Sequence, residues 1–348
     1  MNAEELRLEV LRRLHGVDNA EQESGWIVSR ATAIPVMEFF FQKRPLEDSE
    51  IRNAYAMTDR RLNGEPLQYI LGDEYFGELL LKVGPGCLIP RPETFGIVET
   101  LLPQIPRNGT ICELGVGSGA ISLSLAYARE DLKVYGSELS PDALRWAQRN
   151  LAAYEFKNVE FRSGSLFEPF PGMRFDAVAA NLPYIPREEK PNLQREVRDF
   201  EPDVALFADD GGTALIRRAI RQLDAHLVPG GVAMFEMGAE QTRPLLNFAA
   251  SLPFLAESMI LKDCFGIPLC LLYSSVVSVT SQPLLLSAAK LMLFSLTCKR
   301  FSVLFKTLTF VLLWRTSVLA STTNHCGMML HITSSFHCSR NLIVKPQR

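Results

Sequence analysis

Residues 110–119 read TICELGVGSG, an apolar run that leads directly into three glycines at alternate positions. The run 110–114 has the length and composition of a buried strand. Glycine permits the positive φ angles and the close backbone approach that a tight turn needs. Residues 119–129 have a helical pattern, and a helix amino terminus offers unpaired N–H groups to a carboxylate or phosphate. The stretch therefore predicts a strand, turn and helix that hold a nucleotide-like cofactor.

A carboxylate, Glu138, ends the next predicted strand, residues 133–137. At this position a carboxylate can accept hydrogen bonds from both ribose hydroxyls of a nucleotide cofactor. The spacing Gly115-x-Gly117-x-x-Ala120 also satisfies the dinucleotide fingerprint. These residues by themselves leave NAD open as the cofactor.

A polar tetrapeptide, Asn181-Leu182-Pro183-Tyr184, follows directly on the strand-like run 175–180. Open α/β sheets hold their ligands at the carboxyl ends of strands. Asn181 Oδ1 and the Leu182 carbonyl can accept the two hydrogens of an NH₂ group. The Tyr184 ring can stack on a flat substrate group, and its face attracts a cation. A strand-ending turn is the simpler explanation of these residues, but beside a cofactor loop they predict methyl transfer to nitrogen.

The pattern along the chain predicts an α/β fold. Helical and strand patterns alternate from residue 92 onward, which is typical of a mostly parallel sheet with helices on both faces. The predicted strands are 110–114, 133–137, 158–161, 175–180, 231–236, 257–263 and 267–273, and the predicted helices are 92–102, 119–129, 141–153 and 212–227.

Four parts are expected along the chain. Residues 1–66 have helical patterns and predict a small N-terminal helical domain. Residues 67–91 contain three β-like pieces (67–71, 79–83 and 87–89) among glycines, and predict a linking β-hairpin. The catalytic α/β domain is expected over 92–273, followed by an atypical tail, 274–348.

Charge separates this tail from the rest of the chain. The tail has eight Lys or Arg and no Asp or Glu, so residues 1–273 hold 28 basic and 39 acidic residues, a net charge of −11. Phosphate binding needs a clustered positive face. The acidic body therefore argues against nucleic acid as a direct partner.

The tail also contains an apolar stretch, Phe301–Ala320, that is similar to a membrane span. Lys306 and Arg315 interrupt it, and each would cost about 2.5–3.5 kcal/mol near a bilayer centre. We interpret the tail as an appended segment without a selected fold, such as out-of-frame translation. A membrane-associating tail is the alternative, and membrane contact is expected only then. No metal site is expected, because the spacing of the tail's histidines and cysteines fits no zinc pattern.

The seven cysteines include no CxxC pair. This usage favours reduced thiols over a disulfide framework, and the chain starts without the basic and apolar regions of a secretory signal. A cytoplasmic monomer is the expectation.

Further motifs give the chain a family resemblance over about residues 1–273. The segment Leu88–Thr94 (LIPRPET) is the most specific of them. The others are Gln68–Gly72 (QYILG), Glu113–Ile121 (ELGVGSGAI), Asn181–Ile185 (NLPYI), Phe200–Pro202 (FEP), and Phe235–Gly238 (FEMG) ahead of Gln241. With these motifs the chain resembles the HemK/PrmC family, the peptide chain release factor N5-glutamine methyltransferases. Generic methyltransferases of this fold lack the LIPRPET segment.

The resemblance implies a class I S-adenosylmethionine-dependent methyltransferase fold, with a Rossmann-like seven-stranded sheet behind an N-terminal helical substrate-recognition domain. S-adenosyl-L-methionine is the implied methyl donor. The implied substrate is the glutamine of the Gly-Gly-Gln motif in class-1 peptide chain release factors, the proteins of translation termination, methylated on its side-chain nitrogen N5.

The resemblance also implies roles for particular residues. Glu138 corresponds to the residue that holds the ribose, and Leu166 to one that lines the adenine. The residues that hold the glutamine amide correspond to Asn181, Leu182, Pro183 and Tyr184. Asn181 is also expected to contact the cofactor. The loop that holds the methionine part of the cofactor corresponds to Gly115, Val116, Gly117, Ser118 and Gly119.

Four residues depart from the family pattern. Leu182 stands where proline is usual, but the contact implied there is a main-chain carbonyl, and Pro183 still restricts Leu182 to extended geometry. Ser165 and Phe95 each stand where an acidic residue is common, and Leu269 stands where a basic residue is common.

Three other functions remain to be compared with protein-glutamine methylation. A nucleic-acid amino methyltransferase could use a similar tetrapeptide, but should carry a basic or aromatic face. An NAD-linked oxidoreductase fits the glycine loop and leaves the tetrapeptide unexplained. A membrane-tethered scaffold would make the tail the working part.

Overall fold

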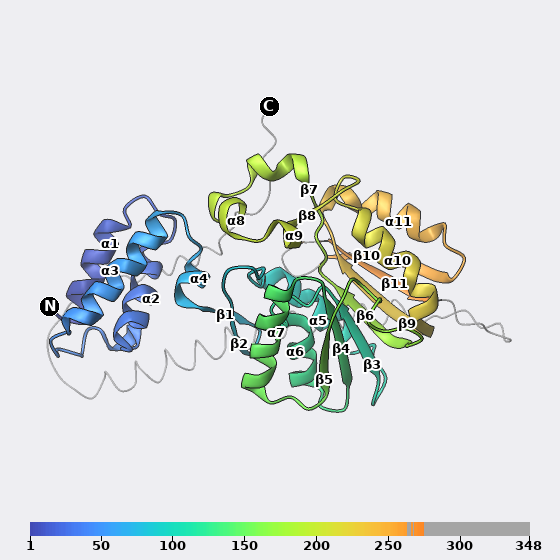
Figure 1. Cartoon of the computed structure of the whole chain (residues 1–348), viewed down its shortest axis with the longest axis horizontal. Coiled ribbons are helices and arrows are strands. Elements are labelled where there is room, and N and C mark those ends of the chain that lie inside the picture. The colour runs from blue at the N-terminus through green and yellow to red at the C-terminus, as the bar shows by residue number, and fades with distance from the viewer. Residues whose placement is uncertain (263–265, 267, 275–348) are drawn as a thin grey trace, which may run out of the picture. The chain divides into compact units, whose positions relative to one another are not determined.

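The computed structural model of the chain describes residues 1–262, 266 and 268–274 (Figure 1). The predicted tail beyond residue 274, with its histidines and cysteines, lies outside the described residues, as does the side chain of Leu269. None of the helices in the described part combines the length and apolar character needed to cross a bilayer.

A seven-stranded sheet in the order β10-β11-β9-β6-β3-β4-β5 forms the centre of the catalytic part (Figure 1). The five strands from β9 to β5 run parallel to one another, and β11 runs antiparallel to both of its neighbours. The predicted mostly parallel sheet is therefore confirmed. Its strands are β3 (Thr110–Leu114), β4 (Lys133–Glu138), β5 (Val159–Ser163), β6 (Phe175–Ala180), β9 (Leu227–Glu236), β10 (Leu255–Lys262) and β11 (Pro268–Ser274).

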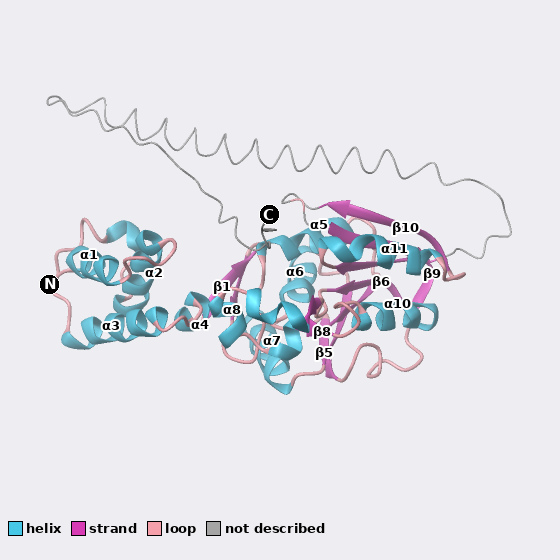
Figure 2. Cartoon of the chain, turned by 90° about the horizontal axis from the view of Figure 1, so that it is seen from above, coloured by secondary structure: helices cyan, strands magenta, loops and turns pink. Residues whose placement is uncertain are grey.

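Alternate residues of the central strands enter two separate apolar cores. Ile111 of β3 packs into one core, and Cys112 and Leu114 pack into the other. Because both faces are covered, apolar residues of this strand point to both sides of the sheet. Figure 2 shows the helices around the sheet. Helices α5 (Phe95–Leu101), α6 (Ala120–Ala128) and α7 (Pro141–Tyr154) contribute to the first core, and α10 (Ala214–His226) and α11 (Thr242–Ala250) to the second.

The N-terminal part is helical, as its pattern predicts. Leu6 and Val10 lie one turn apart in α1 and are fully buried in the same core as Ile27 and Val28. The first helix starts with a capping box, in which Asn2 Oδ1 accepts from the Glu5 N–H at 3.0 Å. The elements here are α1 (Ala3–Arg13), α2 (Ala20–Thr32), the 3₁₀ helix η1 (Val36–Glu38), α3 (Asp48–Leu62) and α4 (Leu67–Leu71).

The predicted hairpin is present, but it is shorter than the three β-like pieces suggest. It comprises β1 (Asp73–Phe76) and β2 (Leu79–Lys82), paired antiparallel. Residues 67–71 form helix α4 and no strand, because Leu67 and Leu71 lie one helical turn apart against the N-terminal core. Residues 87–89 form no strand. Cys87 and Ile89 are buried and Leu88 is partly buried, and the Ile89 N–H donates to Glu201 Oε2 at 3.1 Å.

Asn150 of α7 joins the hairpin to the glycine loop. Its Oδ1 accepts from the Lys82 N–H at 2.7 Å, and its Nδ2 donates to the Ser118 carbonyl at 2.9 Å. Asn150 is 1% exposed, so these bonds lie out of water. A single buried amide therefore fixes the far side of the cofactor loop.

Short elements that the sequence patterns did not reveal connect β6 with α10. They are too short to show a period of hydrophobic residues. These elements are β7 (Ile185–Pro186), η3 (Arg187–Asn192), α8 (Arg195–Phe200), α9 (Asp203–Leu206) and β8 (Phe207–Ala208). Two further 3₁₀ helices lie elsewhere in the chain: η2 (Pro92–Thr94) precedes α5, and η4 (Ala239–Gln241) precedes α11.

Gly136 in β4 provides a test of the packing beneath the glycine loop. A Cβ atom there would overlap Val116 Cγ2 and the Phe161 ring. We expect Gly136→Ala to lower the free energy of unfolding by about 1–3 kcal/mol, because the added methyl must displace both neighbours. Urea denaturation measures this change. Tyr127→Ala, at an exposed position of α6, is the control and should stay within about 0.5 kcal/mol of the parent; equal stability of both variants would contradict the expectation.

Candidate active site

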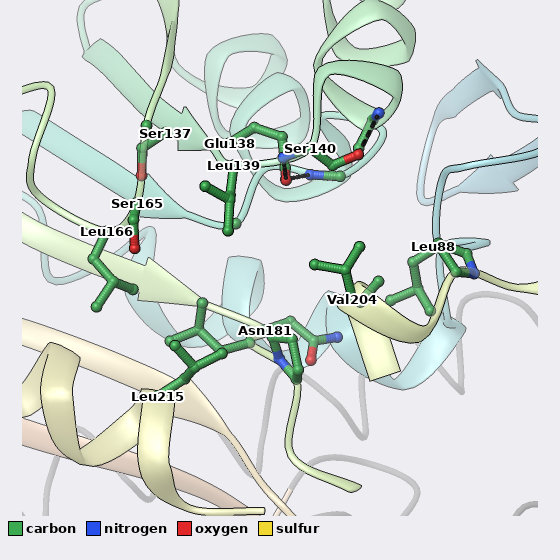
Figure 3. A pocket seen from close by; sticks show the side chains of 18 of the residues that line it. Leu88, Ser137, Glu138, Leu139, Ser140, Ser165, Leu166, Asn181, Val204 and Leu215 are labelled. Carbon is green, nitrogen blue, oxygen red and sulfur yellow. Dashed lines mark hydrogen bonds between the residues drawn. The ribbon is translucent and has the colours of Figure 1, made fainter. Parts of the chain in front are cut away.

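The carboxyl ends of three neighbouring strands meet at one cavity. Leu114 of β3 pairs with Ser137 of β4 and with Ala180 of β6, so the residues that follow these strands share one edge of the sheet. The cavity is open to solvent on one side. Its walls (Figure 3) are Gly86, Leu88, Gly115, Gly117, Ser137, Glu138, Leu139, Ser140, Ala143, Gly164, Ser165, Leu166, Asn181, Leu182, Pro183, Pro202, Val204, Ala205 and Leu215.

The glycine loop presents part of its backbone to this cavity. Gly115 and Gly117 line it with φ angles of 75° and 57°, which favour glycine. The other three loop residues predicted for the cofactor are not among the lining residues. Val116 is buried and packs over Gly136, and Ser118 and Gly119 lead into α6.

Glu138 lies in the cavity wall, where the sequence predicts the ribose contact (Figure 3). Its Oε2 accepts from the Gly117 N–H at 2.9 Å, and its Oε1 accepts from the Ser140 N–H at 2.8 Å. Burial raises the pKa of this carboxyl above its usual value, and the backbone N–H donors oppose the shift. These bonds aim the carboxylate at the cavity while leaving lone pairs for a ligand.

Leu166 and Ser165 form the neighbouring wall (Figure 3). Leu166 is buried and has a φ of 52°, in the left-handed region. Its apolar side chain suits the face of a planar base. Ser165 therefore does occupy the cavity wall at the position where the family commonly has an acidic residue.

The tetrapeptide begins directly opposite a buried carboxylate. Ala180, the last residue of β6, pairs with Phe235 in β9, so Asn181 lies beside Glu236, the last residue of β9. Glu236 is 3% exposed. Thr94 lies between them: its Oγ1 accepts from Asn181 Nδ2 at 3.0 Å and donates to Glu236 Oε2 at 2.7 Å. The Asn181 side chain is thereby held with its amide nitrogen on Thr94.

The same carboxylate holds the other end of the tetrapeptide. The Tyr184 hydroxyl donates to Glu236 Oε1 at 3.1 Å. Burial and the charge of Glu236 both raise the pKa of this hydroxyl, so it remains protonated. Tyr184 is not among the cavity-lining residues, so its stacking on a substrate stays a prediction. Thr94 and Glu236 were visible in the sequence as members of motifs, but nothing there assigned them a role.

Gln241 fixes the backbone of the tetrapeptide. Its Nε2 donates to the Tyr184 carbonyl at 2.6 Å and to the Gly211 carbonyl at 2.8 Å, and its Oε1 accepts from the Gly238 N–H at 3.0 Å. Gly212 passes so close to the Tyr184 carbonyl that a Cβ atom would overlap it. The loop is therefore held by side-chain and main-chain contacts along its length.

An ion pair holds the LIPRPET segment against the FEP motif. The Arg91 guanidinium donates to the Glu201 carboxylate, which is buried and also accepts from the Ile89 N–H. Phe95, one of the departures, packs edge-on against Phe76 with ring centroids 5.4 Å apart. This packing accounts for an aromatic residue at that position, since it closes the space beside the β1–β2 turn.

Comparison with known proteins decides the family. Residues 6–72 match the PrmC N-terminal domain, and residues 105–226 match a methyltransferase domain. The release factor glutamine methyltransferase of Geobacter sulfurreducens is 37% identical over 251 residues, which cover 72% of this chain and 86% of that protein. The Escherichia coli protein of the same name is 38% identical over 202 residues, 58% of this chain and 73% of its own length. The chain belongs to the release factor glutamine methyltransferase family.

The fold of this family member is that of class I S-adenosylmethionine-dependent methyltransferases, as the sequence predicts. Among solved structures, a methyltransferase from Pyrococcus furiosus matches 65% of this chain and 98% of its own, with 15% identity and a TM-score of 0.45. The chain is a methyltransferase and not an NAD-linked oxidoreductase, and its methyl donor is S-adenosyl-L-methionine.

The cavity of this methyltransferase fits that cofactor. A carboxylate held by two backbone N–H groups, an apolar wall at Leu166 and an exposed glycine backbone meet the needs of a ribose, a base and an amino-acid group. Leu139 and Val204 add an apolar rim from opposite sides (Figure 3). When bound, the cofactor supplies an electrophilic methyl group on a sulfonium.

Glu113, beneath the glycine loop, makes a testable contribution to stability. It is 2% exposed and accepts from the Ser122 N–H at 2.9 Å and from the Ser122 hydroxyl. Burial raises its pKa to about 8, against 4.5 for a free group. The folded state then holds a proton that the unfolded state has lost, so stability falls as the pH rises through this window.

We therefore expect Glu113→Gln to gain stability relative to the parent between about pH 4.5 and pH 8, because the glutamine keeps the neutral form at every pH. The difference should reach on the order of a few kcal/mol at the upper end. Urea midpoints across the pH range measure it. Parallel stability curves for the two proteins would show that Glu113 does not titrate in this way.

Proposed function

We propose that this chain transfers the methyl group of S-adenosyl-L-methionine to the side-chain nitrogen N5 of the glutamine in the Gly-Gly-Gln motif of class-1 peptide chain release factors. The observation that carries the proposal is the Asn181 amide, which is fixed through Thr94 at the wall of the cofactor cavity. Family membership supports the same substrate, since the relatives are named release factor glutamine methyltransferases.

An amide nitrogen is a poor nucleophile, because its lone pair is delocalised into the carbonyl. We assign Asn181 Oδ1 and the Leu182 carbonyl as acceptors for its two hydrogens. Holding the nitrogen in line with the methyl carbon supplies part of the roughly 7–11 kcal/mol available from orientation. The new N–C bond replaces the S–C bond, and the nitrogen releases one hydrogen as a proton to solvent. No side-chain nucleophile is needed.

The proposal extends to residues, partner and location. Gly115, Gly117, Glu138 and Leu166 are assigned to the cofactor, with Val116, Ser118 and Gly119 supporting the loop from behind. Pro183 keeps Leu182 extended, and Tyr184 is assigned to the substrate side of the grip. A release factor is the expected protein partner of a cytoplasmic monomer, and the net charge of −11 over residues 1–273 argues against nucleic acid.

The direct experiment is a methylation assay on a purified class-1 release factor with S-adenosyl-L-methionine and the full chain. Mass spectrometry of the Gly-Gly-Gln peptide should find one added methyl on the glutamine. An unmodified peptide, from a preparation that binds S-adenosylhomocysteine, would refute the proposal. RNA and DNA are tested as alternative substrates under the same conditions. Methylation of adenine in either of them would favour a nucleic-acid amino methyltransferase.

Asn181→Ala tests the amide grip. We expect turnover to fall by at least about a hundredfold, because the acceptor nitrogen loses both a hydrogen-bond partner and its orientation. S-adenosylhomocysteine affinity, measured by calorimetry, should change only modestly. Asn247→Ala, an exposed position of α11, is the matched control. Near-normal turnover of Asn181→Ala would remove Asn181 from the catalytic residues.

Glu138→Gln tests the ribose contact. The amide can offer one acceptor oxygen where the carboxylate offers two, so we expect S-adenosylhomocysteine to bind roughly ten- to a hundredfold more weakly. Glu130→Gln, the same change at an exposed site, should bind normally. Equal affinity of the two variants would show that Glu138 does not hold the ribose.

A further inference from the structure

Asn181 is connected to Glu236 through Thr94 by two hydrogen bonds. Which group donates in each bond depends on how many hydrogens each side chain has. Glu236 has two carboxylate oxygens, and each receives a hydroxyl: Thr94 Oγ1 at 2.7 Å and Tyr184 at 3.1 Å. In the structure Glu236 accepts in both of these bonds. A hydroxyl has a single hydrogen, so Thr94 and Tyr184 each give that hydrogen to Glu236.

The donor role of Thr94 determines which group of the Asn181 amide faces Thr94. Having given its hydrogen to Glu236, Thr94 Oγ1 can only accept from its other neighbour, 3.0 Å away. The side-chain group of Asn181 that donates is Nδ2. Its Oδ1 consequently points away from Thr94, and Asn181 lies in the wall of the cavity. A carboxylate that is 3% exposed and one residue beyond Phe235 thus fixes the amide orientation of a residue on another strand.

The orientation matters because the two groups of an amide select opposite ligands. An oxygen that faces the cavity accepts from an NH₂ group and repels a carboxylate, and an NH₂ group that faces the cavity does the reverse. Glutamine and glutamate side chains have nearly the same shape, so the cavity cannot separate them by size. Discrimination between them must come from the direction of hydrogen bonds.

We propose that Thr94 and Glu236 are positioning residues that hold Asn181 Oδ1 toward the cavity and thereby make the site selective for a carboxamide over a carboxylate. This inference rests on the proposed function, and it concerns how the same site recognises its acceptor group. Neither residue needs to touch the substrate.

Two isosteric substitutions remove the fixed orientation of the Asn181 amide in different ways. Thr94→Val removes the hydroxyl, so no partner fixes Asn181 Nδ2. Glu236→Gln introduces an NH₂ group, which can donate to Thr94 and free the Thr94 hydrogen for Asn181 Oδ1. Both orientations of Asn181 then become compatible with complete hydrogen bonding. Thr94→Ser keeps the hydroxyl and its direction, and Thr100→Val makes the same change as Thr94→Val at another buried threonine, in α5.

The readout is binding selectivity, measured with two forms of a class-1 release factor that differ only at the acceptor, Gly-Gly-Gln and Gly-Gly-Glu. Binding is measured in the presence of S-adenosylhomocysteine, so that no turnover occurs. The selectivity is the dissociation constant of the Gly-Gly-Glu form divided by that of the Gly-Gly-Gln form. We expect this ratio to fall roughly tenfold in both Thr94→Val and Glu236→Gln, as the loss of one directed hydrogen bond predicts. Thr94→Ser and Thr100→Val should keep the parental ratio.

Four results decide the matter. An unchanged ratio in Thr94→Val and Glu236→Gln would overturn the proposal, even if turnover falls. Loss of S-adenosylhomocysteine binding in these two variants would also count against it, because it would mean that the residues support the fold generally. A reduced ratio with cofactor binding intact supports it. Failure of the parent protein to methylate the Gly-Gly-Gln form would reject the proposed function itself, which is a separate result.

Discussion

The pairing of Ala180 with Phe235 is the constraint on which the site depends. It places the residues that follow this pair, Asn181 and Glu236, side by side at the end of β6 and β9. Thr94 then completes the connection from a segment that precedes the whole sheet in sequence. A shift of one residue in this register would turn every side chain of the strand to the opposite face. The two apolar cores, which require alternate residues to face opposite sides, prevent such a shift.

Burying a carboxylate at this point has a cost that the surrounding hydroxyls offset. Hydrogen bonds to a charged group contribute roughly 1.5–3 kcal/mol each, and an unpaired buried charge costs several times more. Glu236 receives two hydroxyls, while Gln241 satisfies the Tyr184 carbonyl. These hydrogen bonds hold both ends of the tetrapeptide, and the in-line methyl transfer that we propose requires such positioning.

How much of this the sequence predicts depends on how local each feature is. The strands Thr110–Leu114 and Phe175–Ala180 were predicted to the residue, because a strand covered on both faces is a bounded apolar run. Leu67–Leu71 was misread as a strand, since five residues are too few to separate the two periods. The pairing of Thr94 with Glu236 spans 142 positions, and no local pattern reports it. Similarly, the three alternate glycines predict the loop, but which of its residues face the cavity depends on packing over Gly136.

The residues of the site depend on their side chains to different degrees. In the proposed grip the contact of Leu182 is made by its main-chain carbonyl, so its side chain is free to pack elsewhere. It replaces the usual proline, and its side chain is 4% exposed, within the second core and against Gly115. Burial of a leucine stabilises a fold by about 1.5–3 kcal/mol, while Pro183 keeps the backbone extended as the lost proline ring would have done. Thr94, Asn181 and Glu236 have no such freedom, because each acts through the hydrogen bonds that its own side chain makes.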